Sequence, residues 1–247
     1  MGDGAALSNS LLEVRQLEVV YNRVATAVQG ISLEVASGGI VAMIGTNGAG
    51  KTTTLRAISG FLPAEDVVIT DGSVVFAGAP IAGLMPHVIS RRGVVLVPER
   101  SKLFETLSVE DNLHFNLTRE RRAIRDRVYD YFPRLAERRS QFAGFLSGGE
   151  KQMLAIGMAL VCEPKLLLVD ELSLGLMPKM VDICLDVLMR LKREGLTIVL
   201  VEQNTARALE VADQVCVLSS GVQVFKGTSA EAKSAGSLFA TFLGTTA

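Results

Sequence analysis

The feature that most constrains this chain is a glycine-rich stretch between two apolar patterns of different period. Residues 45–52 read GTNGAGKT and match the pattern GxxxxGK[ST]. Apolar residues alternate or run together from Leu11 to Val20 and from Gly30 to Ile44 as in strands, and the spacing from Lys51 to Ser59 is helical. Glycines let such a loop fold round an anion and point backbone N–H groups at it, beside a helix N-terminus. The stretch therefore predicts a phosphate-binding loop in an α/β domain.

This loop predicts contacts with the phosphates of a nucleotide. Lys51 would bring a positive charge to the β- and γ-phosphates, and the Thr52 hydroxyl would bind Mg²⁺. The expected nucleotide-binding residues are Gly45, Thr46, Asn47, Gly48, Ala49, Gly50, Lys51, Thr52 and Thr53. The alternative is a turn that merely joins a strand to a helix, which the match at every motif position disfavours.

A second apolar run ends in two acidic residues. Residues 166–169, LLLV, precede Asp170 and Glu171, and a further apolar run covers residues 197–201. Both runs predict parallel strands buried on both faces, whose C-terminal ends form the nucleotide site of an open α/β sheet. We expect Asp170 to hold Mg²⁺ and Glu171 to orient and deprotonate the attacking water. By themselves, two acids after a strand are more typical of a solvated turn, but downstream of a phosphate loop the catalytic interpretation is favoured.

The third motif, LSGGE at residues 146–150, opens a helix that we expect to run to about Val161. A serine followed by two glycines at a helix start makes a second candidate anion-binding terminus. Its candidate ligand-binding residues are Ser147, Gly148, Gly149 and Glu150. The alternative is an ordinary serine cap. One chain with a phosphate loop has no obvious need for a second such terminus.

Composition and organisation limit the remaining possibilities. The chain has 247 residues, 49% of them hydrophobic, and a formal net charge of -1, which suits one globular domain and argues against nucleic acid as a partner. We expect a disordered lead-in at residues 1–10, one domain over 11–247, and a charged, helix-periodic lobe at about 104–146. No apolar run approaches the ~20 residues that cross a bilayer. Three widely spaced cysteines in apolar sequence are expected to be core residues: Cys162, Cys184 and Cys216.

The three motifs, in this order and at these separations, resemble the ATPases of ABC transporters over nearly the whole chain. The resemblance implies a P-loop NTPase fold with a mainly parallel core sheet, an antiparallel β subdomain and a small helical lobe, and it implies hydrolysis of ATP with Mg²⁺. In that family two sites are completed head to tail across a dimer, so Ser147 and the glycines after it would close over the γ-phosphate held by the partner subunit. Tyr21 matches the aromatic residue that stacks on adenine, although a lone tyrosine equally suits strand packing.

Two further stretches resemble the branched-chain amino-acid uptake ATPases within that family. Residues 97–100, VPER, and 104–113, FETLSVEDNL, resemble the loop that joins the core to the helical lobe. There Glu99 stands where other families carry Gln, and the resemblance implies that it contacts nucleotide and Mg²⁺. Residues 200–204, LVEQN, put Gln203 in the place of the switch histidine, which implies a catalytic role beside Glu171. Related systems for amides, urea or other amino acids share these loops, so the cargo stays open.

Several positions depart from the family pattern. They are Gly39, where an acidic residue is frequent, Lys151 in place of Gln, Met158 in place of Arg, and Leu172 in place of Pro. Gln203 matters more, because it can hydrogen-bond a γ-phosphate but carries no charge. Charge stabilisation would then come from Lys51, Mg²⁺ and the partner subunit, and we expect a slow or asymmetric ATPase. The alternatives are a non-catalytic nucleotide-binding half of a heterodimer and a soluble ABC ATPase acting on DNA or ribosomes, which usually carries long insertions or a second cassette.

The resemblance also implies partners. Transmembrane permease subunits would dock on the helical lobe and on the loop near Glu99. A second related ATPase would complete a heterodimer, with a homodimer as the lesser alternative. A periplasmic binding protein would be an indirect partner and nucleic acid none. These partners place the chain peripherally on the cytoplasmic face of the inner membrane.

Overall fold

The computed structural model describes residues 10–63, 66–100, 103–114 and 122–235. Most of the expected lead-in, residues 1–9, and part of the expected helical lobe lie outside these ranges, whereas Ser10 already begins a strand. The strands are β1 (Ser10–Tyr21), β2 (Ala25–Ala36), β3 (Ile40–Gly45), β4 (Val67–Phe76), β5 (Ala79–Pro80), β6 (Val94–Val97), β7 (Leu166–Asp170), β8 (Thr197–Glu202), β9 (Gln214–Ser219) and β10 (Val222–Thr228). The helices are α1 (Lys51–Ser59), α2 (Pro86–Arg91), α3 (Val109–His114), α4 (Arg122–Tyr131), α5 (Pro133–Glu137), the 3₁₀ turn η2 (Ala143–Phe145), α6 (Gly148–Leu160), α7 (Pro178–Arg193), α8 (Thr205–Val211) and α9 (Ser229–Ser234).

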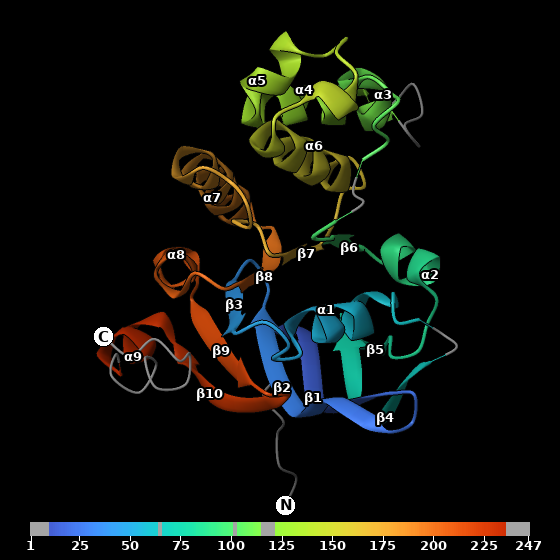
Figure 1. Ribbon diagram of the computed structural model, residues 1–247, viewed down its shortest axis with the longest axis vertical. Coiled ribbons are helices and arrows are strands. Elements are labelled where there is room, and N and C mark those ends of the chain that lie inside the picture. The colour runs from blue at the N-terminus through green and yellow to red at the C-terminus, as the bar shows by residue number, and fades with distance from the viewer. Residues whose placement is uncertain (1–9, 64–65, 101–102, 115–121, 236–247) are drawn as a thin grey trace, which may run out of the picture.

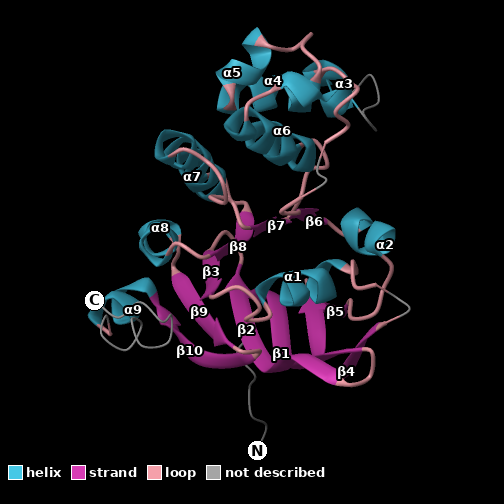
Figure 2. Ribbon diagram, viewed as in Figure 1, coloured by secondary structure: helices cyan, strands magenta, loops and turns pink. Residues whose placement is uncertain are grey.

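The strands of the described ranges form one mixed sheet in the order β5-β4-β1-β2-β10-β9-β3-β8-β7-β6. Strands β9, β3, β8, β7 and β6 pair in parallel, whereas β2, β1, β4 and β5 pair antiparallel. Figure 2 shows the antiparallel strands beside α1 and the parallel strands β6, β7 and β8 between them and the upper helices. The predicted fold class is therefore confirmed, as is the parallel pairing of β7 with β8, in which Leu166 lies opposite Thr197.

The central parallel strands are buried on both faces because alternate residues enter two different cores. On β7, Leu167 and Val169 join a cluster with α6 and α7, while Leu166 and Leu168 join a cluster with α1 and the antiparallel strands. Every residue of β3, β7 and β8 is buried. Two-sided burial is what a continuous apolar run without alternation predicts. This packing fixes the C-terminal ends of the strands, where the polar side chains of the site begin.

Helices α3, α4 and α5 lie together above α6, away from the sheet (Figure 1). Helix α3 begins just after Ser108, whose Oγ accepts a hydrogen bond from the Asp111 backbone N–H at 3.0 Å. The interface between α4 and α6 is close: a Cβ added at Gly157 would lie 2.7 Å from the Val128 side chain. In the described ranges, no helix is long and apolar enough to cross a membrane.

Two local expectations were wrong. Cys184 and Cys216 are buried, but Cys162 is exposed. Cys162 lies just beyond Val161, the C-cap of α6, where the chain turns back to the surface, so its apolar sequence neighbours do not bury it. Strand β2 begins at Ala25, five residues before the apolar run that starts at Gly30. Its first residues are held by pairing with β1 and are partly exposed, so they carry no apolar signal.

Candidate nucleotide site

The phosphate loop joins the end of β3 to the start of α1. Gly48 and Gly50 have φ angles of 80° and 96°, a region in which a side chain is strained. A Cβ at Gly50 would also lie 2.7 Å from the Ala27 carbonyl oxygen. Gly50 is the N-cap of α1 and no side chain caps this helix start. The first backbone N–H groups of α1 therefore remain available to an anion.

Lys51 brings a buried cation to this loop. Its side chain is 3% exposed, and Nζ donates to the carbonyl oxygens of Gly45 at 2.9 Å and Thr46 at 3.0 Å. Burial lowers the pKa of Lys51, an effect opposed by the carboxylates of Glu171 and Asp170. The Glu171 carboxylate lies 3.6 Å from Nζ. The lysine is thus held in place by its own loop, with its charge between backbone carbonyls and one acid.

Asp170 and Thr52 form the second contact between the loop and the sheet. Asp170, the last residue of β7, is 3% exposed and its Oδ1 accepts a hydrogen bond from Thr52 Oγ1 at 3.1 Å. Burial raises the pKa of Asp170, the Thr52 hydrogen bond opposes this shift, and the nearby charges of Glu171 and Glu99 raise it further. A cation at this position would relieve the repulsion between these acids.

The residues at this position suit Mg²⁺. Thr52, Asp170 and Glu99 offer hydroxyl and carboxylate oxygens, the hard donors that Mg²⁺ prefers. Within the described ranges, no group of three His, Cys, Asp or Glu side chains could by itself hold a metal ion. That matches the usual Mg²⁺ site of nucleotide enzymes, where one or two carboxylates bind the ion together with phosphate oxygens and water.

Glu171 and Gln203 meet because β7 and β8 are neighbours whose ends align, with Asp170 opposite Val201. Gln203 Nε2 donates to Glu171 Oε1 at 2.8 Å and to Asn47 Oδ1 at 2.7 Å. Glu171 has a φ angle of 50°, unusual for a residue with a side chain, and its backbone N–H donates to the Val201 carbonyl at 3.1 Å. The two predicted catalytic side chains thus touch each other beside the phosphate loop.

Most of these residues surround one cavity of about 590 Å³, whose lining does not include the buried Asp170. Its lining includes the predicted residues Asn47, Gly48, Ala49, Gly50, Lys51, Thr52, Thr53, Glu99, Glu171 and Gln203. Gly45 and Thr46 line an adjoining cavity together with Asn47 and Gln203. Sequence reasoning missed three lining residues: Ala27, Arg100 and Leu174. Arg100 could have been found, since it follows Glu99 and pairs with it at 2.8 Å, but Ala27 comes from β2 and carries no local signal.

Tyr21 ends β1 beside the same loop. It is partly buried, and its hydroxyl lies 3.3 Å from Thr53 Oγ1, within hydrogen-bond distance. Tyr21 does not line the 590 Å³ cavity. The structure thus brings the tyrosine to the residue that follows Thr52, and the stacking on adenine stays a prediction.

The LSGGE motif lies elsewhere in the molecule. Ser147 is the N-cap of α6: the Glu150 backbone N–H approaches Ser147 Oγ at 3.4 Å, and the Ser147 backbone N–H donates to Glu150 Oε2 at 2.9 Å. This is a capping box. Glu150 also pairs with Arg138 at 2.7 Å and Arg134 at 3.1 Å. No residue of 146–150 lines either cavity at the phosphate loop, and Figure 1 shows α6 and α1 in different parts of the fold.

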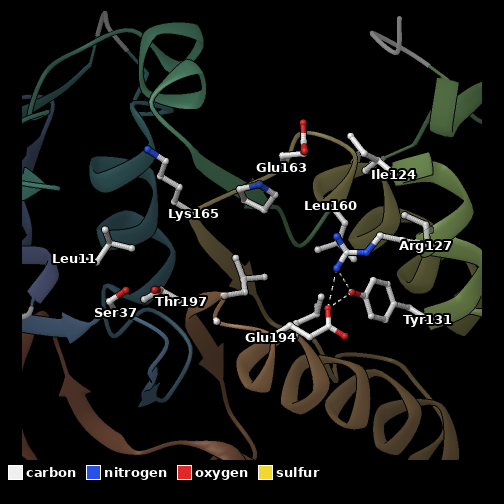
Figure 3. A pocket seen from close by; sticks show the side chains of 15 residues that line it. Leu11, Ser37, Ile124, Arg127, Tyr131, Leu160, Glu163, Lys165, Glu194 and Thr197 are labelled. Carbon is white, nitrogen blue, oxygen red and sulfur yellow. Dashed lines mark hydrogen bonds and ion pairs between the residues drawn. The ribbon is translucent and has the colours of Figure 1, made fainter. Parts of the chain in front are cut away.

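A third cavity, of about 430 Å³, lies at the opposite edge of the sheet (Figure 3). It is lined by Lys165 and Thr197, which stand at the starts of β7 and β8, and by Tyr131 of α4. Arg127 and Tyr131 bond Glu194 across it, with Arg127 at 2.9 Å. Because ligands of open α/β sheets bind outside the carboxyl ends of the strands, this cavity is not the nucleotide site.

Comparison with known proteins agrees with this geometry. A family model described as ABC transporter matches residues 28–173. The high-affinity branched-chain amino acid transport ATP-binding protein BraG of Pseudomonas aeruginosa is 41% identical over 224 residues, covering 89% of this chain and 94% of that protein. The "Probable branched-chain amino acid transport ATP-binding protein LivF" of Archaeoglobus fulgidus is 37% identical over 206 residues, covering 81% and 85%. The ADP conformation of an ATP-binding cassette of an ABC transporter, MJ1267, shares the fold with a TM-score of 0.83 at 23% identity, over 92% of this chain and 95% of that one.

Proposed function

This chain belongs to the ATP-hydrolysing ABC transporter family, and on that premise we propose that it is the ATPase subunit of an importer of branched-chain amino acids. The observation that carries the catalytic part is the meeting of Lys51, Glu171 and Gln203 at one cavity. The cargo is proposed from the BraG and LivF relatives, because each aligns with more than four fifths of this chain.

The phosphate loop and the start of α1 would bind the phosphates. The uncapped N–H groups at the start of α1 and the backbone around Gly48 and Gly50 would surround the β- and γ-phosphates. Lys51 would exchange its contacts with the loop carbonyls for phosphate oxygens, gaining charge-assisted hydrogen bonds. Tyr21 would stack on the adenine ring. Mg²⁺, held by Thr52 and Asp170 with Glu99 nearby, would supply further neutralisation of the phosphate charge.

Glu171 and Gln203 would handle the attacking water. Glu171 orients the water and accepts its proton, while the water oxygen forms a bond to the γ-phosphorus and the bond to the β–γ bridging oxygen breaks, releasing ADP. Gln203 donates a hydrogen bond to Glu171 in the present structure and could donate one to the γ-phosphate instead. A neutral amide adds no charge there, so we expect turnover to be slow.

The separation of the LSGGE motif from the phosphate loop supports completion of the site by a second subunit. Ser147 and Gly148 are exposed at the start of α6 and lie away from the nucleotide cavity of their own chain. Each site of a head-to-tail dimer would then combine the phosphate loop of one subunit with the α6 start of the other. We propose that the partner is a second, related ATPase, with a homodimer as the lesser alternative.

ATP-binding subunits of ABC importers work with transmembrane permease subunits. We place this chain peripherally on the cytoplasmic face of the cell membrane, docked through the helical lobe and the loop near Glu99. A periplasmic binding protein would deliver the cargo to the permease. ATP binding would close the dimer and hydrolysis would reopen it, driving alternating access in the permease.

The decisive experiment measures Mg-ATP hydrolysis by the purified chain, alone and with the ATPase encoded beside its gene, using Glu171→Gln as control. We expect turnover to rise with the neighbour and to vanish in the control. ATP binding without hydrolysis at Glu171 would instead identify a non-catalytic half of a heterodimer. Uptake by proteoliposomes that hold the full transporter then tests the cargo: leucine, isoleucine and valine should be accumulated and urea and amides should not.

A further inference from the structure

We propose that Glu202 is a positioning residue: its buried carboxylate binds the turn after Glu171 and thereby sets Glu171 and Gln203 relative to each other. The inference rests on the proposed function, because it assigns a role in ATP hydrolysis at the same site. It concerns a residue that neither lines the 590 Å³ cavity nor contacts the phosphate loop through a hydrogen bond of its side chain.

Glu202 is the last residue of β8 and is 1% exposed. An acid this deeply buried is costly unless it is hydrogen-bonded. Both carboxylate oxygens accept hydrogen bonds from one residue of the neighbouring segment: Oε1 from the Ser173 backbone N–H at 2.9 Å and Oε2 from the Ser173 hydroxyl at 2.6 Å. The carboxylate therefore joins the end of β8 to the turn that follows β7.

The surroundings of Glu202 show that it is well satisfied. Burial raises its pKa, and hydrogen bonds from Ser173 and from the backbone amides of Asn204 and Gln203 oppose that shift. The same carboxylate thus contacts the turn after β7 and the backbone of the loop that carries Gln203. One buried group holds both segments that supply the catalytic side chains.

The turn after β7 needs such an anchor. Glu171 adopts a φ of 50°, in the left-handed region that is strained for a residue with a side chain. Such a conformation persists only where the surrounding structure enforces it. Here the Glu171 N–H is bonded to Val201 on one side and Ser173 is bonded to Glu202 on the other. Leu172, between them, is fully buried.

The contacts close a ring. Gln203 Nε2 bonds Glu171 Oε1 at 2.8 Å, Gln203 follows Glu202 in the chain, and Glu202 holds Ser173, two residues beyond Glu171. A small cavity of about 190 Å³ lies at this ring and is lined by Glu171, Ser173, Glu202 and Gln203 among others. If the bond between Glu202 and Ser173 is lost, the turn can relax and Glu171 moves away from the water that it must orient.

The test compares Glu202→Leu, which removes both acceptors, with Ser173→Ala and Ser173→Thr in the full chain together with its partner ATPase. We expect kcat to fall on the order of tenfold or more in Glu202→Leu and several-fold in Ser173→Ala, because displaced catalytic groups typically cost 10- to 100-fold. Ser173→Thr keeps the hydroxyl and should retain wild-type kcat. The Kd for ATP should stay within about twofold throughout, since no phosphate contact changes.

Thr197→Val is the matched control, because it removes a buried hydrogen bond away from the site and should therefore affect stability alone. Thr197 stands at the other end of β8, is 1% exposed, and accepts a hydrogen bond from the Gly38 N–H at 2.9 Å. This variant should lower the melting temperature without lowering kcat. The double variant Ser173→Ala/Glu202→Leu should be no slower than Glu202→Leu alone, because the bond that Ser173→Ala removes is one of the two that Glu202→Leu already removes.

The outcomes distinguish a failure of the positioning role of Glu202 from a failure of the proposed ATPase function on which it rests. No hydrolysis by the wild-type complex overturns both. If the wild type hydrolyses ATP and Ser173→Ala keeps full kcat, the positioning role of Glu202 is wrong while the ATPase assignment stands. The Ser173→Ala measurement decides this even if Glu202→Leu fails to fold. A fall of kcat in Thr197→Val that matches the fall in Ser173→Ala would likewise overturn it, because the effect would then follow stability alone.

Discussion

The starts of α1 and α6 are both glycine-containing helix N-termini, but they differ in capping and in surroundings. Helix α1 begins after Gly50 with no side-chain cap, in a cavity that holds a buried lysine and several acids. Helix α6 begins after Ser147 with a complete capping box and is exposed at its first residues. An uncapped start leaves donors for a ligand, whereas a capped start has already satisfied part of its own.

This difference indicates which part of the nucleotide site a single chain can form without a second subunit. The α1 start already has its cation, its acids and the amide of Gln203 in place, so we expect it to bind nucleotide without a second subunit. The α6 start offers the exposed Ser147 and Gly148 and does not line the cavity at the phosphate loop of its own chain. We therefore expect changes at α1 to alter binding and chemistry in any assembly, and changes at α6 to alter turnover only in a dimer.

The largest effect is expected from Glu171→Gln at the α1 side. It should reduce kcat by about 10³-fold, roughly 4 kcal/mol of transition-state stabilisation, because the proton acceptor for water is lost. The Kd for ATP should change less than about twofold, since the phosphate contacts remain. A phosphate-release assay and titration with a fluorescent ATP analogue measure the two quantities. Normal turnover would remove Glu171 from the chemistry.

Lys51→Ala should come next and should act on binding itself. The variant loses the buried ammonium that would pair with phosphate oxygens, and ATP affinity should fall about 10- to 100-fold. It also loses the bonds to the Gly45 and Thr46 carbonyls, so the empty protein should be measured for a change in melting temperature. Calorimetric titration with Mg-ATP measures the affinity, and an unchanged Kd would count against the phosphate-loop assignment.

Gly148→Ala tests the role of the α6 start. A Cβ there meets only Leu176 Cδ2 at 3.5 Å, an ordinary contact, so the melting temperature should not change. If this helix start faces the partner's nucleotide, the extra methyl group should lower turnover of the dimer about tenfold while leaving ATP binding to the single chain unaltered. Gly149 is unsuitable for this test, because its Cβ would lie 2.5 Å from Met180 Cε. Unchanged turnover in Gly148→Ala would contradict the interpretation that the α6 start faces the nucleotide of the partner subunit.

Glu150→Gln should give the smallest effect, on stability. Burial by itself would raise the pKa of Glu150, but hydrogen bonds from Ser147 and Arg134 and the charge of Arg138 bring it below its ordinary value. A carboxyl with a lowered folded-state pKa stabilises the fold above its unfolded pKa, near 4.3, and loses that contribution as pH falls through the folded value.

At pH 7 we therefore expect Glu150→Gln to be about 1 kcal/mol less stable than the wild type, because Gln keeps the capping box but not the pairs with two half-exposed arginines. The gap should narrow as the pH is lowered below about 4. Urea unfolding of both proteins across this range measures it. A gap that widens on acidification would contradict the assignment of the stabilising charge to Glu150.

Much of the fold followed from local pattern. The helix from Lys51 to Ser59, the parallel pair β7 and β8, and the start of α6 at the LSGGE motif were predicted because a glycine-rich loop, an unbroken apolar run and a serine before two glycines each leave a signature within a few residues. The exposure of Cys162 and the early start of β2 were not, because burial and strand pairing depend on segments far away in the chain.

The motifs, the strands and helices that flank them and the residue types needed for ATP hydrolysis could be read from the chain alone, since these depend on chemistry carried by short segments. Only the tertiary structure decided which of them meet. It aligned the ends of β7 and β8, so that Gln203 touches Glu171 and Glu202 holds Ser173. It also placed the start of α6 outside the cavity at the phosphate loop. The physical reason is that strand register and helix packing are set by the burial of whole faces, which bring together residues that no local spacing relates.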